Sequence, residues 1–213
     1  MLSLFLVYQV IKLCQEQLEI KKLAKAPVAL REIGAERIAL NKIMLPKYLK
    51  GKILVMIDAA NLESSVKDLG WWIDYIKLRN LFDGKKLVEI RNYCVHHGAK
   101  SQNNFFTFLK KNKFILITKP LKIIKQNDIE AGDIRKANFD VEIAVDAMEM
   151  VDKFDTLVLF SGDSDFNYLV ENLKQKNKRI IVISSKYHVA KELIQSSSKY
   201  IDIRKLKALI KRK

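Results

Sequence analysis

The chain has 213 residues, of which 49% are hydrophobic, and a formal net charge of +15. This length and apolar content allow one domain of ordinary size with an appendage, and seven glycines and three prolines argue against a fibre or a disordered protein. The two cysteines, Cys14 and Cys94, exclude a disulfide framework and favour a reducing, cytoplasmic setting.

The positive charge is concentrated at the two ends of the chain. Residues 1–50 have a net charge of +5 and residues 199–213 a net charge of +6, so the middle is nearly balanced. Excess positive charge of this kind favours a polyanion such as RNA as the partner, with salt-sensitive affinity. A lysine-rich chain with a solvated basic tail explains the charge equally well.

Residues 1–50 are predicted to form a helical N-terminal extension. Apolar residues at near-helical spacing indicate helices over 4–25 and 28–43, separated by Pro27. The segment contains no recognisable motif, so we expect it to serve in interaction or oligomerisation, for example in a homodimer formed through these helices. Residues 1–13 are too short to span a bilayer and lack the basic start of a signal peptide, so no membrane partner is expected.

From Lys52 onward, short apolar runs typical of buried strands alternate with helical segments. We expect strands at 52–58, 86–95, 113–125 (two short ones), 155–162 and 178–185. We expect helices after residue 58 and at 103–112, 140–154, 165–177, 189–195 and 203–212, with a loop at 126–138. This alternation predicts an α/β fold, a sandwich with a mainly parallel central sheet over residues 51–206, followed by a basic tail at 207–213.

Aspartates follow two of the predicted strands, at the edge of the sheet where ligands gather in such folds. Asp58 ends the run KILVMID, and Asp163 and Asp165 follow the run TLVLFSG. A single aspartate in this position is more often a helix N-cap than a ligand. Capping explains only one member of the pair, however. If Ser164 or Asp165 caps the next helix, Asp163 needs another role.

The helix predicted from residue 140 adds further carboxylates. Asp140 is well placed as its N-cap, and Asp146 shares a helical face with Glu142 and Glu149, which also fits an ordinary solvated face. Several carboxylates that converge on one cleft repel each other unless a cation is bound. Mg²⁺ or Mn²⁺ would suit such an oxygen-rich site.

Three stretches resemble the sequence blocks of the NYN domain, a PIN-like nuclease group that includes the LabA-like proteins. They are ILVMIDAANL (53–62), KANFDVEIAVDAM (136–148) and LVLFSGDSDFNYLVENLKQKNKRIIVI (157–183), and residues 190–206 resemble the last helix and edge strand of the family. The resemblance implies a PIN-like three-layer α/β/α fold and metal-dependent cleavage of RNA. The residues that match its acidic positions are Asp58, Asp140, Asp146, Asp163 and Asp165.

The same resemblance implies that Asn61 and Ser161 orient ligands or water. Two turns depart from the family: Ala59 or Ala60 stands where glycine is more common, and Asn138-Phe139 replaces glycine and a branched residue. Neither departure removes a carboxylate.

Four lysines are candidates for contacts with a nucleic-acid backbone: Lys119, Lys122, Lys125 and Lys136. The first three alternate with apolar residues in TKPLKIIK, so a strand there would direct basic groups to one side. The alternative is a solvated edge strand whose lysines discourage edge pairing.

The predicted function is that of an endoribonuclease using Mg²⁺ or Mn²⁺, with RNA, or else DNA, as substrate. Two alternatives stay open, an RNA-binding adaptor that has lost activity and a small-molecule phosphohydrolase. Because no glycine-rich phosphate loop is present, Rossmann and P-loop nucleotide sites are disfavoured.

Overall fold

The computed structural model describes residues 45–124, 134–136 and 138–213. They belong to one compact unit, Leu45–Lys213. The predicted N-terminal helices and Cys14 lie outside the described residues. Within those residues, the structure has no helix that is both long enough and apolar enough to cross a membrane.

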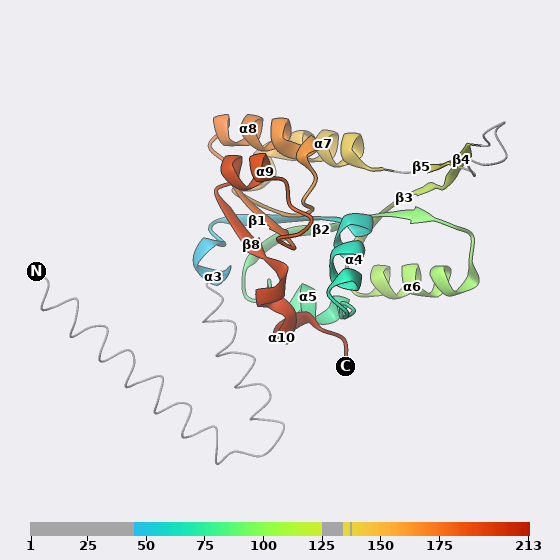
Figure 1. Ribbon diagram of the computed structural model, residues 1–213. Coiled ribbons are helices and arrows are strands. Elements are labelled where there is room, and N and C mark those ends of the chain that lie inside the picture. The colour runs from blue at the N-terminus through green and yellow to red at the C-terminus, as the bar shows by residue number, and fades with distance from the viewer. Residues whose placement is uncertain (1–44, 125–133, 137) are drawn as a thin grey trace, which may run out of the picture. The chain divides into compact units, whose positions relative to one another are not determined.

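The centre of the unit is a six-stranded sheet in the order β3-β2-β1-β6-β7-β8, with every neighbouring pair parallel (Figure 1). Its strands are β1 (Lys52–Asp58), β2 (Lys86–His96), β3 (Ile115–Pro120), β6 (Thr156–Phe160), β7 (Arg179–Ser184) and β8 (Lys199–Asp202). The predicted parallel α/β sandwich is therefore confirmed.

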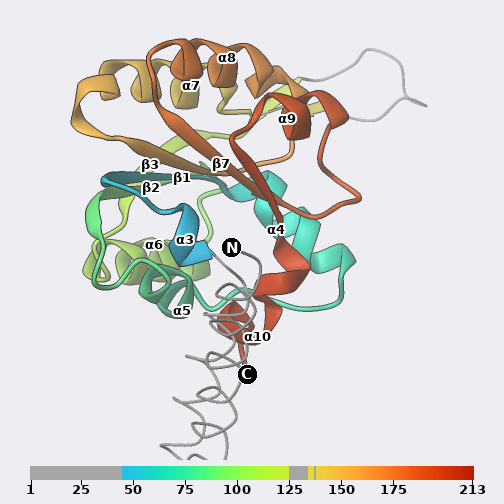
Figure 2. The same ribbon diagram turned by 90° about the vertical axis from the view of Figure 1, so that its left-hand side faces the viewer.

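Helices cover both faces of the sheet (Figure 2). On one face lie α7 (Asp140–Glu149), α8 (Asn167–Gln175) and α9 (Lys191–Ser196), and on the other α4 (Ala59–Asp68), α5 (Tyr75–Asn80), α6 (Lys100–Lys111) and α10 (Lys207–Ile210). The remaining helical elements are α3 (Leu45–Tyr48) and the 3-10 turns η1 (Val151–Lys153), η2 (Ser164–Phe166) and η3 (Ile203–Leu206).

The central strands are apolar throughout because both of their faces are covered. Every residue of β6 is buried, as are the five residues Ile53–Ile57 of β1. Successive side chains point to opposite faces. One set packs against α7, α8 and α9 in a single core cluster that includes Leu54, Met56, Leu157, Leu159, Ile143, Ala147, Leu169 and Leu173.

The strand order creates a topological switch point between β1 and β6. The chain moves outward from β1 through β2 to β3 and then returns to place β6 on the other side of β1. The helix that follows β1, α4, covers one face, whereas α8 after β6 covers the opposite face. The two connections therefore diverge at the carboxyl ends of these strands, which is where ligands bind in open α/β sheets.

Several element boundaries differ from the sequence-based predictions. Residues 134–136 form a strand, β5, that pairs antiparallel with β4 (Lys122–Ile124), so the prediction of a continuous loop at 126–138 was wrong there. The short helix α5 was not predicted. The helix predicted over 140–154 ends at Glu149, and the one predicted over 203–212 divides into η3 and α10.

The C-terminal residues pack against the domain instead of leaving it as a basic tail. Leu209 and Ile210 are buried. The Ile210 carbonyl accepts a hydrogen bond from the backbone N–H of Asp74 at 2.8 Å, and the backbone N–H of Arg212 donates to the Trp72 carbonyl at 2.8 Å. The apolar positions of KLKALIKRK therefore complete the layer that contains α5.

Candidate metal centre

Asp58 is fixed at the end of β1 by hydrogen bonds from two directions. Its carboxylate caps α4 by accepting from the backbone N–H of Asn61 at 3.2 Å, and it also accepts from the Ser161 hydroxyl at 3.2 Å. Burial raises the pKa of Asp58, these two hydrogen bonds lower it, and the nearby charge of Asp163 raises it. The residue therefore joins β1 to the segment that follows β6.

Asp163 caps the turn that follows β6. Its carboxylate accepts from the backbone N–H of Asp165 at 3.1 Å, and its own backbone N–H donates to the Ser161 hydroxyl at 3.3 Å. The expectation that Ser164 or Asp165 would be the cap was wrong, because the helical segment begins with a 3-10 turn one residue earlier than predicted. Asp165 is thereby left with an exposed carboxylate.

Gly162 is required at this turn for space. A Cβ atom at this position would lie 2.1 Å from the backbone oxygen of His188 and 2.6 Å from the Ser184 hydroxyl. The Gly162 carbonyl accepts from the backbone N–H of Ala190 at 2.9 Å, and its N–H donates to the Asn61 side chain at 3.0 Å. The turn therefore lies directly against the segment that follows β7.

Asp140 brings a third acid to this edge of the sheet from the start of α7. It is the first residue of α7 and not the N-cap, because Phe139 occupies the cap position, so the N-cap prediction was wrong. The Asn138 side chain donates to the Asp140 carboxylate at 2.6 Å. One carboxylate oxygen from each of Asp140, Asp163 and Asp165 lies within 4.8 Å of the other two.

Burial and the charges of this group raise the pKa of Asp140 to about 6. Burial is the largest cause, followed by the negative charges of Asp163, Asp58 and Asp165, and Lys119 opposes them. Burial and three neighbouring carboxylates thus disfavour the charged form of Asp140 more than the nearby Lys119 favours it. A hard divalent cation with oxygen ligands fits this donor set, because it would relieve the repulsion among the carboxylates.

Asp146 lies outside this group of three. Its carboxylate accepts from the Tyr93 hydroxyl at 2.7 Å and pairs with Arg91 at 2.7 Å, and Arg91 also pairs with Glu89 at 2.8 Å. Burial and the Asp146 carboxylate raise the pKa of Tyr93, which keeps its hydroxyl a donor. Metal ligation by Asp146 stays a prediction, and in this structure the residue links α7 to β2 through an ion pair.

Arg91 and Tyr93 were not singled out from the sequence. The available signal was their spacing of two within β2, which places both side chains on the face that α7 covers. Asn138 was likewise noted only as a departure from the family and not as a partner of Asp140.

The candidate nucleic-acid contacts lie on and beyond β3. Lys119 pairs with Glu142 at 2.7 Å, and its ammonium group lies 4.6 Å from the centroid of the Phe139 ring. Lys122 and Lys136 are register partners in the β4–β5 ribbon. Lys125 lies outside the described residues. Contact between these lysines and a nucleic acid stays a prediction.

The comparison with known proteins decides the family. The NYN domain matches residues 52–204, which is most of the chain. The chain belongs to the NYN domain family. The resemblance seen in the three sequence blocks is thereby confirmed, and the NYN domain is a PIN-like nuclease family that typically uses a divalent metal.

Two relatives agree with this assignment. The chain is 29% identical over 164 residues to the Low amplitude and bright protein LabA of Synechococcus elongatus, covering 76% of this chain and 88% of the relative. A crystal structure of a protein of unknown function from Vibrio parahaemolyticus superposes with a TM-score of 0.63 at 25% identity, covering 76% of this chain and 97% of that one. The NYN fold therefore accounts for about three-quarters of the chain, and the described acidic group lies within the matched region.

Proposed function

We propose that this NYN protein is a metal-dependent ribonuclease that cleaves phosphodiester bonds of RNA. The observation that supports the proposal best is the convergence of Asp140, Asp163 and Asp165 within 4.8 Å at the carboxyl edge of the sheet. The raised pKa of Asp140 adds that burial and the neighbouring carboxylates disfavour its charged form. These three residues would hold Mg²⁺ or Mn²⁺, with Asp58 adjoining them on β1.

A divalent ion in such a site supplies an activated water and neutralises charge on the phosphate and the leaving oxygen. The residues of the chain position that ion. Ser161 and Asn61 hold the ends of β1 and β6 together through Asp58 and Gly162, so they act as positioning residues. Lys119 lies near enough to Asp140 to oppose the rise of its pKa, and it would offer its charge to a bound phosphate.

The test is cleavage of an internally labelled single-stranded RNA by purified protein with Mn²⁺, Mg²⁺ or EDTA. We expect cleavage only with the divalent ions and none by Asp163→Asn. Asparagine is also a good N-cap, so this variant keeps the hydrogen bond to Asp165 and removes only the charge. Asp152→Asn, which changes an exposed acid near the opposite ends of the strands, is the matched control and should stay active.

Activity that survives both Asp58→Asn and Asp163→Asn would place the chemistry elsewhere or in a contaminating nuclease. Failure to cleave RNA or DNA with either ion would instead favour an RNA-binding adaptor. Dimerisation through residues 1–50 is a separate proposal. Light scattering of the full chain and of a chain that begins at Leu45 tests it. If both proteins have the same number of chains per particle, dimerisation through residues 1–50 is excluded.

A further inference from the structure

A turn that follows β7 lies beside Gly162, the residue that precedes Asp163. Because β7 runs parallel to β6, residues 185–190 leave the sheet at the same edge as Asp163. The Ala190 N–H donates to the Gly162 carbonyl at 2.9 Å, and the His188 backbone fills the space beside the Gly162 Cα. The turn therefore lies next to the segment that carries Asp163 and Asp165.

The turn presents an exposed aromatic ring with two cations close to it. Tyr187 is 68% exposed. The Lys186 ammonium lies 4.8 Å from the ring centroid, and the Arg204 guanidinium carbon lies 5.5 Å from it. Arg204 belongs to η3, which follows β8, the next strand of the sheet. An aromatic face and two positive groups thus meet at one place from two separate segments.

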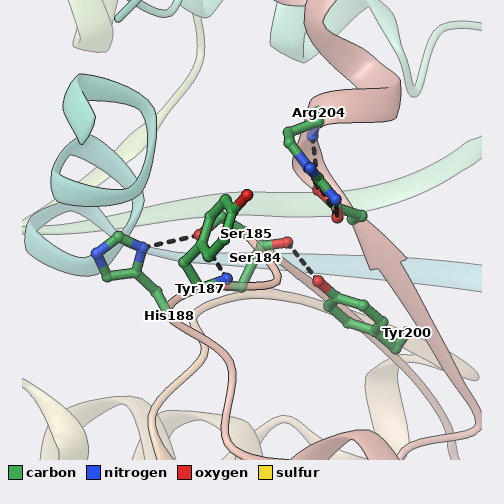
Figure 3. A network of polar contacts seen from close by, with 7 residues as sticks. Ser184, Ser185, Tyr187, His188, Tyr200 and Arg204 are labelled. Atoms are coloured by element: carbon green, nitrogen blue, oxygen red, sulfur yellow. Dashed lines mark hydrogen bonds and ion pairs between the residues drawn. The ribbon is translucent and has the colours of Figure 1, made fainter. Parts of the chain in front are cut away.

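Both segments are held by networks of polar contacts (Figure 3). The buried Ser185 hydroxyl bonds His188 Nδ1 at 2.7 Å and accepts from the Tyr187 N–H at 3.3 Å. His188 Nε2 lies 2.9 Å from the Asp68 carboxylate at the end of α4. The turn is therefore anchored to the end of α4, while its tyrosine faces solvent.

The arginine is fixed in the same way. Arg204 Nε donates to both oxygens of Asp202 at 3.0 Å, and its Nη2 also donates to that carboxylate. The Tyr200 hydroxyl donates to the Ser184 carbonyl at 3.0 Å and ties β8 to the end of β7. Fixed groups lose little conformational entropy when a ligand binds, which is the property expected of a preformed subsite.

We propose that Tyr187, Lys186 and Arg204 form a subsite for one unpaired nucleobase and its phosphate in single-stranded RNA. The inference rests on the proposed function in that the same strand would pass the acidic centre. An exposed tyrosine ring can stack on a base of any identity, whereas a paired base inside a duplex cannot reach it. Within the described part of the chain, Lys186 forms no ion pair, so its charge is available for the phosphate.

The experiment measures binding by fluorescence anisotropy with a fluorescein-labelled 12-nucleotide RNA of A and U, alone and annealed to its complement. Binding is measured in EDTA and again with Ca²⁺. Tyr187→Ala should raise the Kd for the single strand at least about fivefold and leave the duplex unchanged, because one stacked base is lost. Tyr187→Phe keeps the ring and should bind like the unchanged protein. Trp72→Ala removes an exposed aromatic ring of the layer that contains α5 and should have no effect.

Lys186→Ala is the second variant, and it should weaken binding of both RNAs and reduce the salt dependence. Equal single-strand binding by Tyr187→Ala, or an equal loss for the duplex, would overturn the subsite, as would the absence of RNA binding by the unchanged protein. If the protein cleaves RNA but Tyr187→Ala binds the single strand as the unchanged protein does, only the subsite is refuted. Single-strand binding that depends on Tyr187 but is never followed by cleavage would refute only the nuclease. Thermal melts establish that each variant is folded.

Discussion

The side-chain oxygen of Asn61 accepts a hydrogen bond from the backbone N–H of Gly162 at 3.0 Å. These residues lie 101 positions apart in the chain, and the bond joins the first turn of α4 to the turn after β6. Asn61 also donates its backbone N–H to Asp58. One asparagine thereby fixes the spacing between the two strand ends that carry Asp58 and Asp163.

Replacing this asparagine should loosen the site and the fold together. Asn61→Ala leaves the Gly162 N–H without its partner, so we expect the free energy of unfolding to fall by about 1–2 kcal/mol. Urea unfolding followed by circular dichroism measures the loss. Ser64→Ala, at an exposed position of the same helix, should change stability by much less. Equal stabilities of the two variants would show that the Asn61–Gly162 bond contributes nothing.

Gly162→Ala tests the close approach of the turn after β7. The added methyl would overlap the His188 backbone, which cannot rotate away as a side chain could, so we expect a loss of about 2–3 kcal/mol. Gly98→Ala adds the same methyl where no atom lies within 4 Å, at a φ of +79°. Its cost should be limited to about 1 kcal/mol of backbone strain. Gly162→Ala should therefore melt at a lower temperature than Gly98→Ala. A smaller loss of stability for Gly162→Ala than for Gly98→Ala would contradict the close packing of the His188 backbone on Gly162.

The raised pKa of Asp140 predicts a pH dependence of stability in the absence of divalent ions. The folded protein holds the proton up to about pH 6, whereas the unfolded chain releases it near pH 3.8. The folded state thus binds more protons between these values, so this stabilisation is complete below about pH 4 and is lost as the pH rises through 6. Because burial and the neighbouring carboxylates disfavour a charged Asp140, Asp140→Asn should be more stable than the unchanged protein at pH 7.5.

The gain in Asp140→Asn should be about 1 kcal/mol, because the carboxylate is partly solvated and screening reduces the full effect. Urea unfolding in EDTA at pH 4.5 and pH 7.5 measures it, with Asp152→Asn as the control that should show no gain. Adding Mn²⁺ at pH 7.5 should reverse the order, since only the unchanged protein keeps all three carboxylates. If the unchanged protein and Asp140→Asn show the same change in stability between pH 4.5 and pH 7.5 in EDTA, the raised pKa of Asp140 is contradicted.

The role of Asp146 can be tested separately from that of the metal group, because Asp146 has two partners of its own, Arg91 and Tyr93. Asp146→Asn weakens the pair with Arg91 and the bond from Tyr93, so we expect a loss of about 1–3 kcal/mol in stability. Stabilisation by Mn²⁺ should persist. Tyr93→Phe removes only the hydroxyl and should reproduce part of the loss. If Asp146→Asn instead keeps full stability and no longer responds to Mn²⁺, Asp146 is a ligand.

Much of the fold was visible in the sequence because strands buried on both faces are unbroken apolar runs. Ile53–Ile57 and Thr156–Phe160 could be placed almost to the residue for this reason. The strand Ile134–Lys136 was missed since three residues in a charged stretch have no periodicity to detect. The short helix Tyr75–Asn80 was missed for the same lack of length.

The sequence by itself determined that Asp58 and Asp163 would meet at one edge, because residues that end parallel strands share that edge. The sequence predicted metal ligation by both Asp140 and Asp146, but spacing along α7 could not show which partners each carboxylate would meet. Tertiary structure placed Arg91 and Tyr93 of β2 beside Asp146, and Asp163 and Asp165 beside Asp140. It also brought Tyr187 and Arg204 together, because contacts between neighbouring strands join segments that no local pattern relates.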